Sequence, residues 1–572
     1  MPIHNRDIAE IFEQTADLLE IKGDNPFRIR AYRNAALTIQ NLSQDVNELI
    51  KQGKDLSELP GIGEDLANKV AGIVKTGKFP VLEKLTKKYP LELCELMKIT
   101  GLGAKRVKVL YEELNIKNLT DLEKAARKGE IRSLPSFKEK TEKSILEGIK
   151  FKTSEAGRIK LYEAEQITNA LINYLRQDKR VENIAVAGSN RRQKDTVGDA
   201  DILISYRSGA DIMERFVKYE DVTKVISKGE AKSTVLLRSR FQVDLRLIVK
   251  QSFGAALLYF TGSKAHNIAI RKIANKKGLK ISEYGVFRGK KRIAGKTEQQ
   301  VYATIDLPYI EPELRENQGE IEAAQDGKLP NLVKLEDIKG DLHVHTNATD
   351  GHNTLEEMAN AAQKKGYQYI AISDHSKHVT IAHGFKAKDL TRQIAQIDKL
   401  NSKLKNITIL KSIELDILED GSLDLPDDIL KELDLTVCAI HYKFNLSKDK
   451  QTERVLKAMD NPYFNIFAHP TGRLINERGP YEIDIERIIK AAKQKNCVLE
   501  LNAYPNRLDL NDIYCHMAKD VGVKIAISTD SHSINDLNFM RFGVGQARRG
   551  WLEKGDVINT RSVEQLRKLL KR

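Results

Sequence analysis

Three aspartates on two alternating strands are the first residues in this sequence that could do chemistry. The segment 188–204, GSNRRQKDTVGDADILI, passes a Gly-Ser turn and two arginines and enters a strand in which Asp199 and Asp201 face the same side. Further along, Asp244 lies at the centre of a second alternating strand, 241–248. If these strands are neighbours, three carboxylates converge and repel one another unless cations bind between them. Hard oxygen ligands predict Mg²⁺ or Mn²⁺, and a pair of such ions favours attack of a hydroxyl on a nucleotide α-phosphate.

An interpretation of this segment without metal binding is also open. A single Asp-x-Asp on a strand is more often part of a turn or a solvated face than a metal site. Here the preceding Gly-Ser turn, the arginine pair and the third aspartate on an apolar strand favour the metal site. Gly188 and Ser189 would then offer a backbone N–H and a hydroxyl to the outer phosphates, and Arg192 a planar guanidinium.

These residues resemble the nucleotidyltransferase signature of the family X DNA polymerases, the group that includes polymerase beta. Residues 254–287, GAALLYFTGSKAHNIAIRKIANKKGLKISEYGVF, are similar to the thumb of that family. The resemblance implies that the three aspartates are catalytic and that the nucleotide is bound by Gly188, Ser189, Arg192, Tyr259, Phe260, Gly262, Lys264 and Asn267. It implies DNA contacts for Arg246, Arg271, Glu283 and Tyr284. Simple core packing is the alternative for Tyr259 and Phe260.

The charge distribution favours a nucleic-acid partner. The chain has 572 residues and a formal net charge of +14, and the stretch 231–300 holds 16 Lys and Arg against three Asp and Glu. A phosphate backbone would be attracted to this stretch, although a solvated charged face has the same composition. Four scattered cysteines without CxxC spacing favour a reducing cytosol. We expect a cytoplasmic, nucleoid-associated monomer with no membrane segment, acting on gapped or nicked duplex DNA and deoxynucleoside triphosphates.

Two glycine turns near the N-terminus predict a grip on the DNA backbone. LPGIGEDLANKV at 59–70 and ITGLGAKRVKVL at 99–110 each place a Gly-x-Gly turn before a helix, whose N-terminus favours an anion. Both resemble helix-hairpin-helix motifs, which bind phosphates without reading the base sequence. The expected DNA-binding residues here are Gly61, Gly63, Lys69, Gly101, Gly103 and Lys105.

Lys69 allows two interpretations. In polymerase beta, a lysine at this place of the motif forms a Schiff base with a 5′-deoxyribose phosphate, and such a lysine needs a lowered pKa. The neighbouring Glu64 and Asp65 favour phosphate binding instead. In that interpretation, the pocket for a 5′-phosphate is completed by Arg28, Arg30, Tyr32 and Arg33.

The second half of the chain shows a recurring pattern of histidines and carboxylates. Ten of the twelve histidines lie after residue 339. His343 and His345 alternate in one strand, and the later candidates follow apolar, β-branched runs that precede helical stretches. This periodicity predicts a βα barrel with its site at the carboxyl ends of the strands. The candidate ligands for a cluster of Mn²⁺, Zn²⁺ or Fe ions are His343, His345, Asp350, His375, Glu414, His441, His469, Asp530 and His532.

This half resembles the PHP (polymerase and histidinol phosphatase) domain. The resemblance implies that the nine candidates hold three metal ions, and that metal-activated hydroxide hydrolyses a phosphate ester. Glu500 and Asn502 end another strand and are expected behind the ligands. Four loop residues are candidates for contact with a substrate phosphate, although such residues are as often merely solvated: His352, His378, His383 and Arg473.

Together, the two halves predict a multidomain family X DNA polymerase with a C-terminal PHP domain. The expected parts are two helical helix-hairpin-helix domains (1–90 and 91–150), an α+β nucleotidyltransferase palm (151–250), a thumb (251–315), a linker (316–338) and a distorted (βα)7 PHP barrel (339–572). The expected function is synthesis that fills short repair gaps, with a PHP site that gives 3′–5′ exonuclease, 3′-end processing and abasic-site incision. Three alternatives stay open: a PHP small-molecule phosphatase tethered to the other half, a DNA-end-binding scaffold and a template-independent nucleotidyltransferase.

Overall fold

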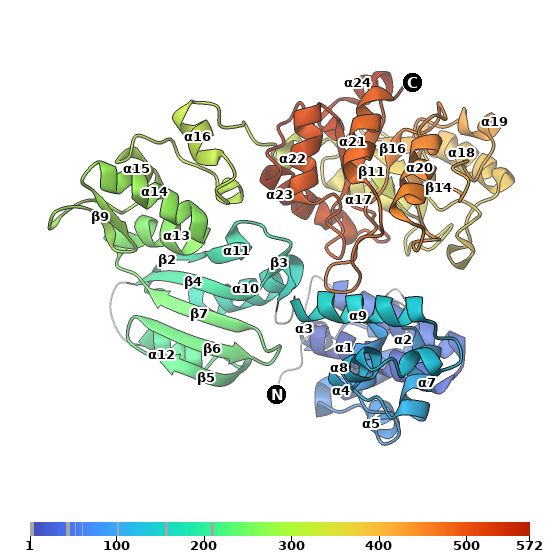
Figure 1. The fold of residues 1–572 in the computed structure, drawn as a ribbon, viewed down its shortest axis with the longest axis horizontal. Helices are drawn as coiled ribbons and strands as arrows, with labels where there is room; N and C mark the ends of the chain where they lie inside the picture. The colour runs from blue at the N-terminus through green and yellow to red at the C-terminus, as the bar shows by residue number, and fades with distance from the viewer. Residues whose placement is uncertain are drawn as a thin grey trace. The chain divides into compact units, whose positions relative to one another are not determined.

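A computed structural model of the chain describes residues 5–41, 46–51, 53–59, 61–99, 102–154, 158–206 and 211–571. The chain forms two compact units (Figure 1). The first consists of Met1–Ala156 with Asn476–Gly479, and the second of Gly157–Ile475 with Pro480–Arg572. No helix among the described residues is long and apolar enough to cross a bilayer.

The first unit is helical. Apolar residues at helical spacing in its first helix, such as Ile8, Phe12 and Leu19, are buried in a cluster that extends to Ile149. Both segments for which the sequence suggests separate helical domains therefore contribute to one core. The helices are α1 (Asn5–Lys22), α2 (Pro26–Asn41), α3 (Val46–Lys51), α4 (Glu64–Thr76), α5 (Pro80–Thr86), α6 (Glu92–Met97), α7 (Ala104–Leu114), α8 (Leu119–Arg127) and α9 (Glu139–Ser154).

The second unit begins with the segment predicted as the palm, a five-stranded mixed sheet. In spatial order its strands are β2 (Val181–Val186), β4 (Asp199–Tyr206), β7 (Gln242–Leu247), β6 (Lys232–Leu237) and β5 (Val222–Lys228). β4 and β7 run parallel, and the other neighbours are antiparallel. The short strands β1 (Ile159–Lys160) and β3 (Thr196–Val197) form a separate pair.

The two faces of the palm sheet are covered by different helices. Ile202 and Ile204 pack with α10 (Leu161–Arg176) and α12 (Asp211–Val217). Leu203, on the opposite face, packs with α13 (Phe253–Thr261). Because side chains alternate along a strand, Asp199 and Asp201 share the face of Leu203.

The predicted thumb begins with α13. It contains α14 (Lys264–Lys276), an antiparallel sheet of β8 (Lys280–Ser282), β9 (Gly285–Arg288) and β10 (Lys291–Ala294), and α15 (Glu298–Ala303). Residues 316–338, for which the sequence suggests a linker, contain α16 (Glu320–Gln325). Ile321 and Ala324 of α16 are buried in the same cluster as Ile270 and Val301 of the thumb. Glu320 lies 2.6 Å from the buried His266 of α14, so this stretch is packed onto the thumb.

The PHP part is built on parallel strands only. One sheet holds β11 (Gly340–Val344), β12 (Tyr369–Ile372) and β13 (Thr408–Lys411); the other holds β14 (Glu414–Asp416), β15 (Val437–Ala439), β16 (Ile466–Phe467), β17 (Val498–Asn502) and β18 (Ile525–Ser528). β13 and β14 follow one another so closely that they form one interrupted strand. Parallel bridges His375–Glu414 and Val344–Ser531 join the two sheets, which gives seven strand positions around a barrel. The predicted multidomain architecture is confirmed.

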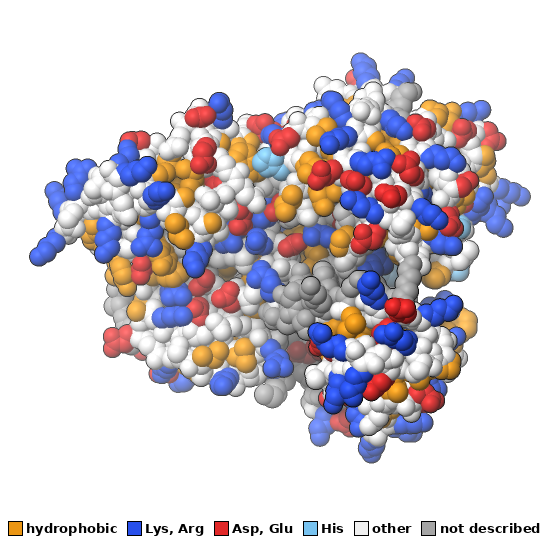
Figure 2. Space-filling model, viewed as in Figure 1, with side chains coloured by type: hydrophobic (Ala, Val, Ile, Leu, Met, Phe, Trp, Pro, Cys, Tyr) orange, Lys and Arg blue, Asp and Glu red, His pale blue; other side chains and the backbone are white. Residues whose placement is uncertain are grey.

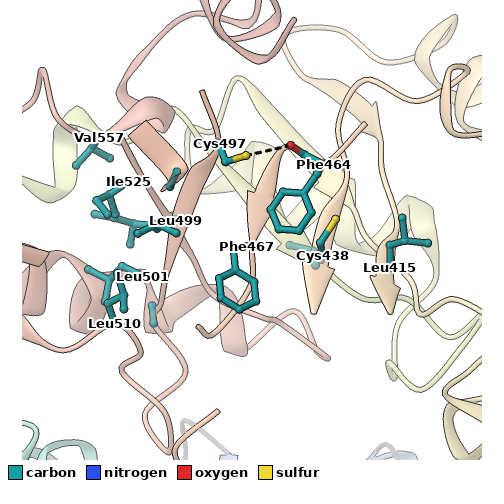
Figure 3. Packing of buried hydrophobic residues seen from close by; sticks show 14 of the residues in the cluster. Leu415, Cys438, Phe464, Phe467, Cys497, Leu499, Leu501, Leu510, Ile525 and Val557 are labelled. Carbon is teal, nitrogen blue, oxygen red and sulfur yellow. Dashed lines mark hydrogen bonds between the residues drawn. The ribbon is translucent and has the colours of Figure 1, made fainter. Parts of the chain in front are cut away.

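Alternating residues of the barrel strands pack outward and inward. Outside, Leu499, Phe467 and Cys438 lie in the core shown in Figure 3, where the thiol of Cys497 is 3.8 Å from the carbonyl oxygen of Phe464. Inside, a second cluster combines large side chains such as Leu410 and Ile466 with small ones such as Ala439 and Ala526. The surrounding helices are α17 (Leu355–Lys364), α18 (Ala387–Asn401), α19 (Asp427–Leu430), α20 (Lys448–Ala458), α21 (Ile485–Gln494), α22 (Asp512–Val521), α23 (Met540–Arg549) and α24 (Val563–Leu570).

Candidate active sites

The palm carboxylates come together at the edge of two parallel strands. In the β4–β7 register, Asp201 is directly opposite Asp244, and Asp199 is opposite Gln242. The predicted adjacency of the two strands is confirmed. Asp244 is buried, Asp201 is half-buried and Asp199 is exposed, so the group opens to solvent on one side.

Basic side chains already neutralise part of this group. The Arg246 guanidinium has its Nε 3.3 Å from Asp201 Oδ1 and its Nη2 3.1 Å from Asp244 Oδ2, while Lys232 Nζ lies 2.6 Å from Asp244 Oδ2. Burial, with a smaller contribution from Asp199 and Asp244, raises the pKa of Asp201 despite Arg246. Clustered carboxylate oxygens whose repulsion is only partly relieved suit a hard divalent cation. Arg246, which the resemblance places at DNA, thus lies at the carboxylates and stacks on Phe260 at 4.1 Å.

The Gly-Ser turn is tied to the same strand. The Ala187 N–H donates to the carbonyl oxygen of Asp201 at 2.8 Å, and the turn leads into α11 (Gly188–Arg191). Gly188 has φ +65°, and a Cβ there would lie 3.5 Å from Asp201 Oδ2. The left-handed backbone of the turn therefore favours glycine, whereas a Cβ at 3.5 Å from the carboxylate would make only ordinary van der Waals contact.

Arg192 is held rather than free. Its Nε lies 3.0 Å from Glu316 Oε1, and its Nη1 donates to the carbonyl oxygen of Thr261. A Cβ on Gly262 would approach Arg192 Nη1 to 3.2 Å, so the predicted nucleotide residues Arg192 and Gly262 are neighbours. The neighbouring Arg191 forms a buried ion pair with Glu298, which Arg315 shares at 2.6 Å.

The remaining thumb candidates lie on α13, α14 and the following hairpin. Asn267 Nδ2 donates to the carbonyl oxygen of Tyr259 at 2.6 Å, and the Tyr259 and Phe260 rings meet edge to face. Lys264 is the first residue of α14. The candidates expected near the template are less enclosed, and Tyr284 is 65% exposed: they are Arg271, Glu283 and Tyr284. Figure 2 shows Lys and Arg gathered at the tip formed by β9 and β10, where Arg288, Lys290 and Lys291 are exposed.

The two glycine turns of the first unit each open a helix. Gly63 is the N-cap of α4 and Gly103 is the N-cap of α7, and Gly61 adopts φ +72°. Gly101 lies outside the described residues. A cavity of about 830 Å³ lies between α1, α2 and the start of α7, and its basic lining residues are Arg30, Arg33, Lys105, Arg106 and Lys108. Backbone N–H groups at a helix start and several cations form a surface suited to phosphates.

Lys69 is paired with an acid. Its Nζ lies 2.5 Å from Asp65 Oδ2 and 5.3 Å from the ring centre of Tyr32. Partial burial alone would lower its pKa, but hydrogen bonds with Asp65 and Tyr32 outweigh burial and raise the pKa of Lys69. A Schiff-base nucleophile needs the opposite shift, so these contacts favour phosphate binding by Lys69.

The candidate PHP ligands converge at the carboxyl ends of the barrel strands. Within each of three overlapping groups, the potential ligand atoms lie within 4.8 Å of one another. His469 joins them through its Nε2, which is 3.0 Å from Glu414 Oε1. The groups are His345, Asp350, His375 and His532; His343, His345 and Asp530; and His375, Glu414 and His441. These overlapping groups form a buried site able to hold several metal ions.

Charge in this cluster is balanced by imidazoles. Burial alone would raise the pKa of Glu414, but His375, His441 and His343 hold it well below its usual range. Burial alone would lower the pKa of His441, but Glu414 and Asp416 raise it to about 10. The buried Nδ1 of His345 makes no hydrogen bond to the described residues. This nitrogen lies 3.6 Å from Asp350 Oδ1, and a ring nitrogen that faces a carboxylate without a hydrogen bond fits a metal ligand.

Buried acids behind the ligands orient them. Glu500, expected there, lies 2.8 Å from His343 Nδ1, and Asn502 Nδ2 donates to Asp530 Oδ2 at 3.0 Å. Asp416, 3.3 Å from His441 Nδ1, and Asp374, which accepts from the Thr346 hydroxyl at 2.7 Å, are not anticipated from the sequence. Their signal is position alone, since each acid lies one or two residues from a ligand along a strand end.

The loop candidates divide into two kinds. The His378 ring packs on Tyr442 with centroids 4.1 Å apart and is exposed at the mouth of the barrel strands. Arg473, expected near a substrate phosphate, instead donates to Asp195 of the palm at 2.9 Å and to the carbonyl oxygen of Arg507 at 2.9 Å. Arg507, whose Nε lies 3.7 Å from Asp530 Oδ2, has no local sequence signal that marks it as part of the site.

Comparison with known proteins decides the family. A protein of Bacillus subtilis (strain 168) named "DNA polymerase/3'-5' exonuclease PolX" is 38% identical over 574 residues, which cover the whole of both chains. The chain belongs to the family X DNA polymerases. Models of known families match this family X chain as a helix-hairpin-helix domain (3–79), a SAM-like helix-hairpin-helix tandem (94–151), a DNA polymerase beta thumb (256–316) and a PHP domain (341–504).

The PHP part of this family X chain has further relatives. Proteins named "Probable phosphatase" from Thermoanaerobacter sp. (strain X514) and Acetivibrio thermocellus are 32% and 30% identical over 244 and 249 residues. Each alignment covers about two fifths of this chain and almost all of the relative, 94% and 95%. The barrel therefore resembles proteins that consist of little else.

Proposed function

We propose that this family X chain is a DNA-directed DNA polymerase with a 3′–5′ exonuclease in its PHP domain. The observation that carries the proposal is the presence of two separate ligand sets in one chain. One is the strand pair that places Asp201 opposite Asp244, and the other is the set of nine clustered PHP residues. The name of the full-length Bacillus subtilis relative supports both activities.

In the palm, Asp199, Asp201 and Asp244 would hold two Mg²⁺ or Mn²⁺ ions, which supply charge stabilisation for attack of a primer 3′-hydroxyl on the α-phosphate. Gly188, Ser189 and Arg192 would bind the outer phosphates. The thumb residues Tyr259, Phe260, Gly262, Lys264 and Asn267 would hold the sugar and base. Arg271, Glu283 and Tyr284 would contact the template side.

In the PHP domain, the nine residues would hold three ions of Mn²⁺, Zn²⁺ or Fe, which supply a hydroxide for phosphodiester hydrolysis. Glu500 and Asp416 would keep His343 and His441 in the orientation that binds metal. The substrate would be the 3′ end of a DNA strand, including 3′-phosphates, other blocking groups and abasic sites.

The biological role would be the filling of short gaps during DNA repair. The two helix-hairpin-helix elements would hold gapped or nicked duplex DNA by its backbone, through the start of α4, the start of α7 and the basic cavity between α2 and α7. The chain would act as a monomer on the nucleoid in the cytoplasm.

A second function for the PHP site is hydrolysis of a small phosphomonoester. The full-length match to proteins named "Probable phosphatase" is the observation that favours it. Comparison of phosphate release from histidinol phosphate with nucleotide release from a DNA 3′ end, at equal enzyme concentration, separates the two. Faster turnover of the small ester would assign the PHP site to it.

The main proposal is tested with a one-nucleotide gapped duplex labelled at the 5′ end of the primer, in the presence of Mn²⁺. We expect extension by one nucleotide when the templated deoxynucleotide is present and stepwise shortening without it. Asp199→Ala should remove only extension, and His343→Ala only shortening. An unchanged primer in both lanes, with the duplex bound, would leave the scaffold interpretation instead.

A further inference from the structure

The palm and the PHP domain share a core, here named the palm–PHP interface. Tyr162 of α10 packs edge to face on Phe539 and Phe542, with centroids 5.6 Å and 5.7 Å away. Lys160 Nζ donates to Asn506 Oδ1 at 2.7 Å. The buried apolar members of the same cluster include Leu161 and Val197 of the palm and Ile475 and Leu508 of the PHP domain.

At one edge of this interface, an arginine of the PHP domain reaches the nucleotide-binding turn. Arg549, the last residue of α23, donates from Nη1 to the carbonyl oxygen of Arg192 at 2.8 Å. The same Nη1 lies 3.0 Å from Glu316 Oε1. That carboxylate oxygen is also 3.0 Å from Arg192 Nε. Arg549 thus fixes the backbone of Arg192 directly and its side chain through Glu316.

Arg549 itself is buried and paired. Arg549 is 6% exposed, and its Nη2 lies 2.5 Å from Asp512 Oδ2 of the PHP domain. One turn earlier, α23 approaches the palm so closely that a Cβ on Gly545 would lie 2.8 Å from Gln193 Oε1. The helix therefore presses against the residue that follows Arg192, and a buried guanidinium with three partners has little freedom to swing away.

We propose that Arg549 is a positioning residue for Arg192, so that the PHP domain completes the nucleotide site of the polymerase. The inference rests on the proposed role of Arg192 in binding the triphosphate. A guanidinium binds phosphate in a planar fork, so its orientation decides how well the bound nucleotide is held. Without Arg549, both the carbonyl of Arg192 and the shared Glu316 lose a fixed partner, and the fork turns away from the phosphates.

The test is steady-state kinetics of the full chain on a one-nucleotide gap. Arg549→Ala should raise the KM for the templated deoxynucleotide about tenfold, with kcat, the affinity for gapped DNA and the exonuclease rate within twofold of the parent. Arg549→Lys, which keeps one charged contact, should recover part of the loss. Glu316→Gln weakens the same link from its other end and leaves Arg549 in place, so it should raise the same KM and reports on the link even if Arg549→Ala folds poorly.

Two controls separate this inference from its alternatives. Arg548→Ala removes the neighbouring arginine of α23, which pairs with Glu313 at 2.6 Å and does not contact Arg192, so it should leave the nucleotide KM unchanged. An equal rise in Arg548→Ala would mean general loosening and overturn the inference. Arg192→Ala tests the role on which it rests: a KM raised by Arg192→Ala but not by Arg549→Ala or Glu316→Gln overturns the inference alone, whereas no effect of Arg192→Ala overturns both.

Discussion

The palm site and the PHP site balance their charges in opposite ways. In the palm, carboxylates face one another, and the cations beside them are the long side chains of Arg246 and Lys232 at a half-open edge. In the PHP domain, buried carboxylates alternate with imidazoles at fixed strand ends. Accordingly, the pKa of Asp201 is raised by burial, whereas the pKa of Glu414 is lowered by histidines that outweigh burial.

From this difference in charge balance we expect the two sites to differ in how long a metal ion stays bound. A flexible arginine or lysine can move aside when a divalent ion arrives with its nucleotide, so the palm is suited to ions that come and go. In the PHP site, the imidazoles and carboxylates are fixed at the strand ends and do not swing in to take the place of a metal ion. The PHP site is therefore suited to resident ions that also contribute to stability.

The largest expected effect is the separate loss of one activity in a variant of either site. His345→Ala, at a residue that belongs to two of the three candidate ligand groups, should lower the exonuclease rate about a thousandfold, because a metal ion would contribute several kcal/mol to stabilising the transition state. Primer extension should stay within twofold of the parent. Asp201→Ala should give the reverse pattern, and both rates are measured on one labelled primer. Parallel loss of both activities in either variant would contradict independent sites.

Removal of metal tests whether resident ions in the PHP site stabilise the folded protein. Ions bound only to the folded protein at a hundred times their Kd add about 2.7 kcal/mol to its stability. Prolonged chelation should therefore lower the melting temperature of the second unit, which holds the PHP site, by several degrees and leave that of the helical first unit nearly unchanged. Scanning calorimetry of the full chain measures both, and the metal-ligand variant His345→Ala should already melt low without chelator.

A smaller effect is expected from an acid that only orients a ligand. Asp416→Asn keeps the shape of the side chain beside His441 Nδ1 and removes its charge. We expect a loss of about 10- to 100-fold in exonuclease rate or metal affinity, as is usual for residues behind a ligand. Titration of metal into the chelated variant measures the affinity, and rescue of the rate at high metal concentration would show that binding is what suffers.

The smallest expected effect concerns DNA binding, on which both activities depend. Lys105, in the first turn of α7, would contact a phosphate, so Lys105→Ala should weaken DNA binding evenly and reduce the slope of log affinity against log salt by about one. Extension and exonuclease should fall by similar factors of a few-fold at limiting DNA. Glu112→Ala on the same helix is a matched control that leaves the helix start intact.

Local patterns predicted the chemistry better than they predicted the connections. The Asp-x-Asp alternation and the strand-end histidines are encoded within a few residues, so the pairing of the two palm strands and the clustering of the PHP candidates follow from the sequence. The partner of Arg192 could not be found in this way, because Glu316 lies far along the chain in a stretch whose composition suggests a linker. Arg473 likewise looks like a phosphate ligand locally, and only the tertiary structure supplies Asp195 as its partner.

The aromatic contacts at the palm–PHP interface have a practical consequence for dividing the enzyme. A polymerase fragment that ends at residue 338 would leave Tyr162 without the Phe539 and Phe542 rings that pack on it. Leu161 and Val197 would lose the PHP members of their buried cluster. Newly bared apolar surface of this kind promotes self-association. Poor recovery of such a fragment from expression would then reflect aggregation through the exposed palm side of the palm–PHP interface. A polar substitution at Tyr162 should improve its solubility.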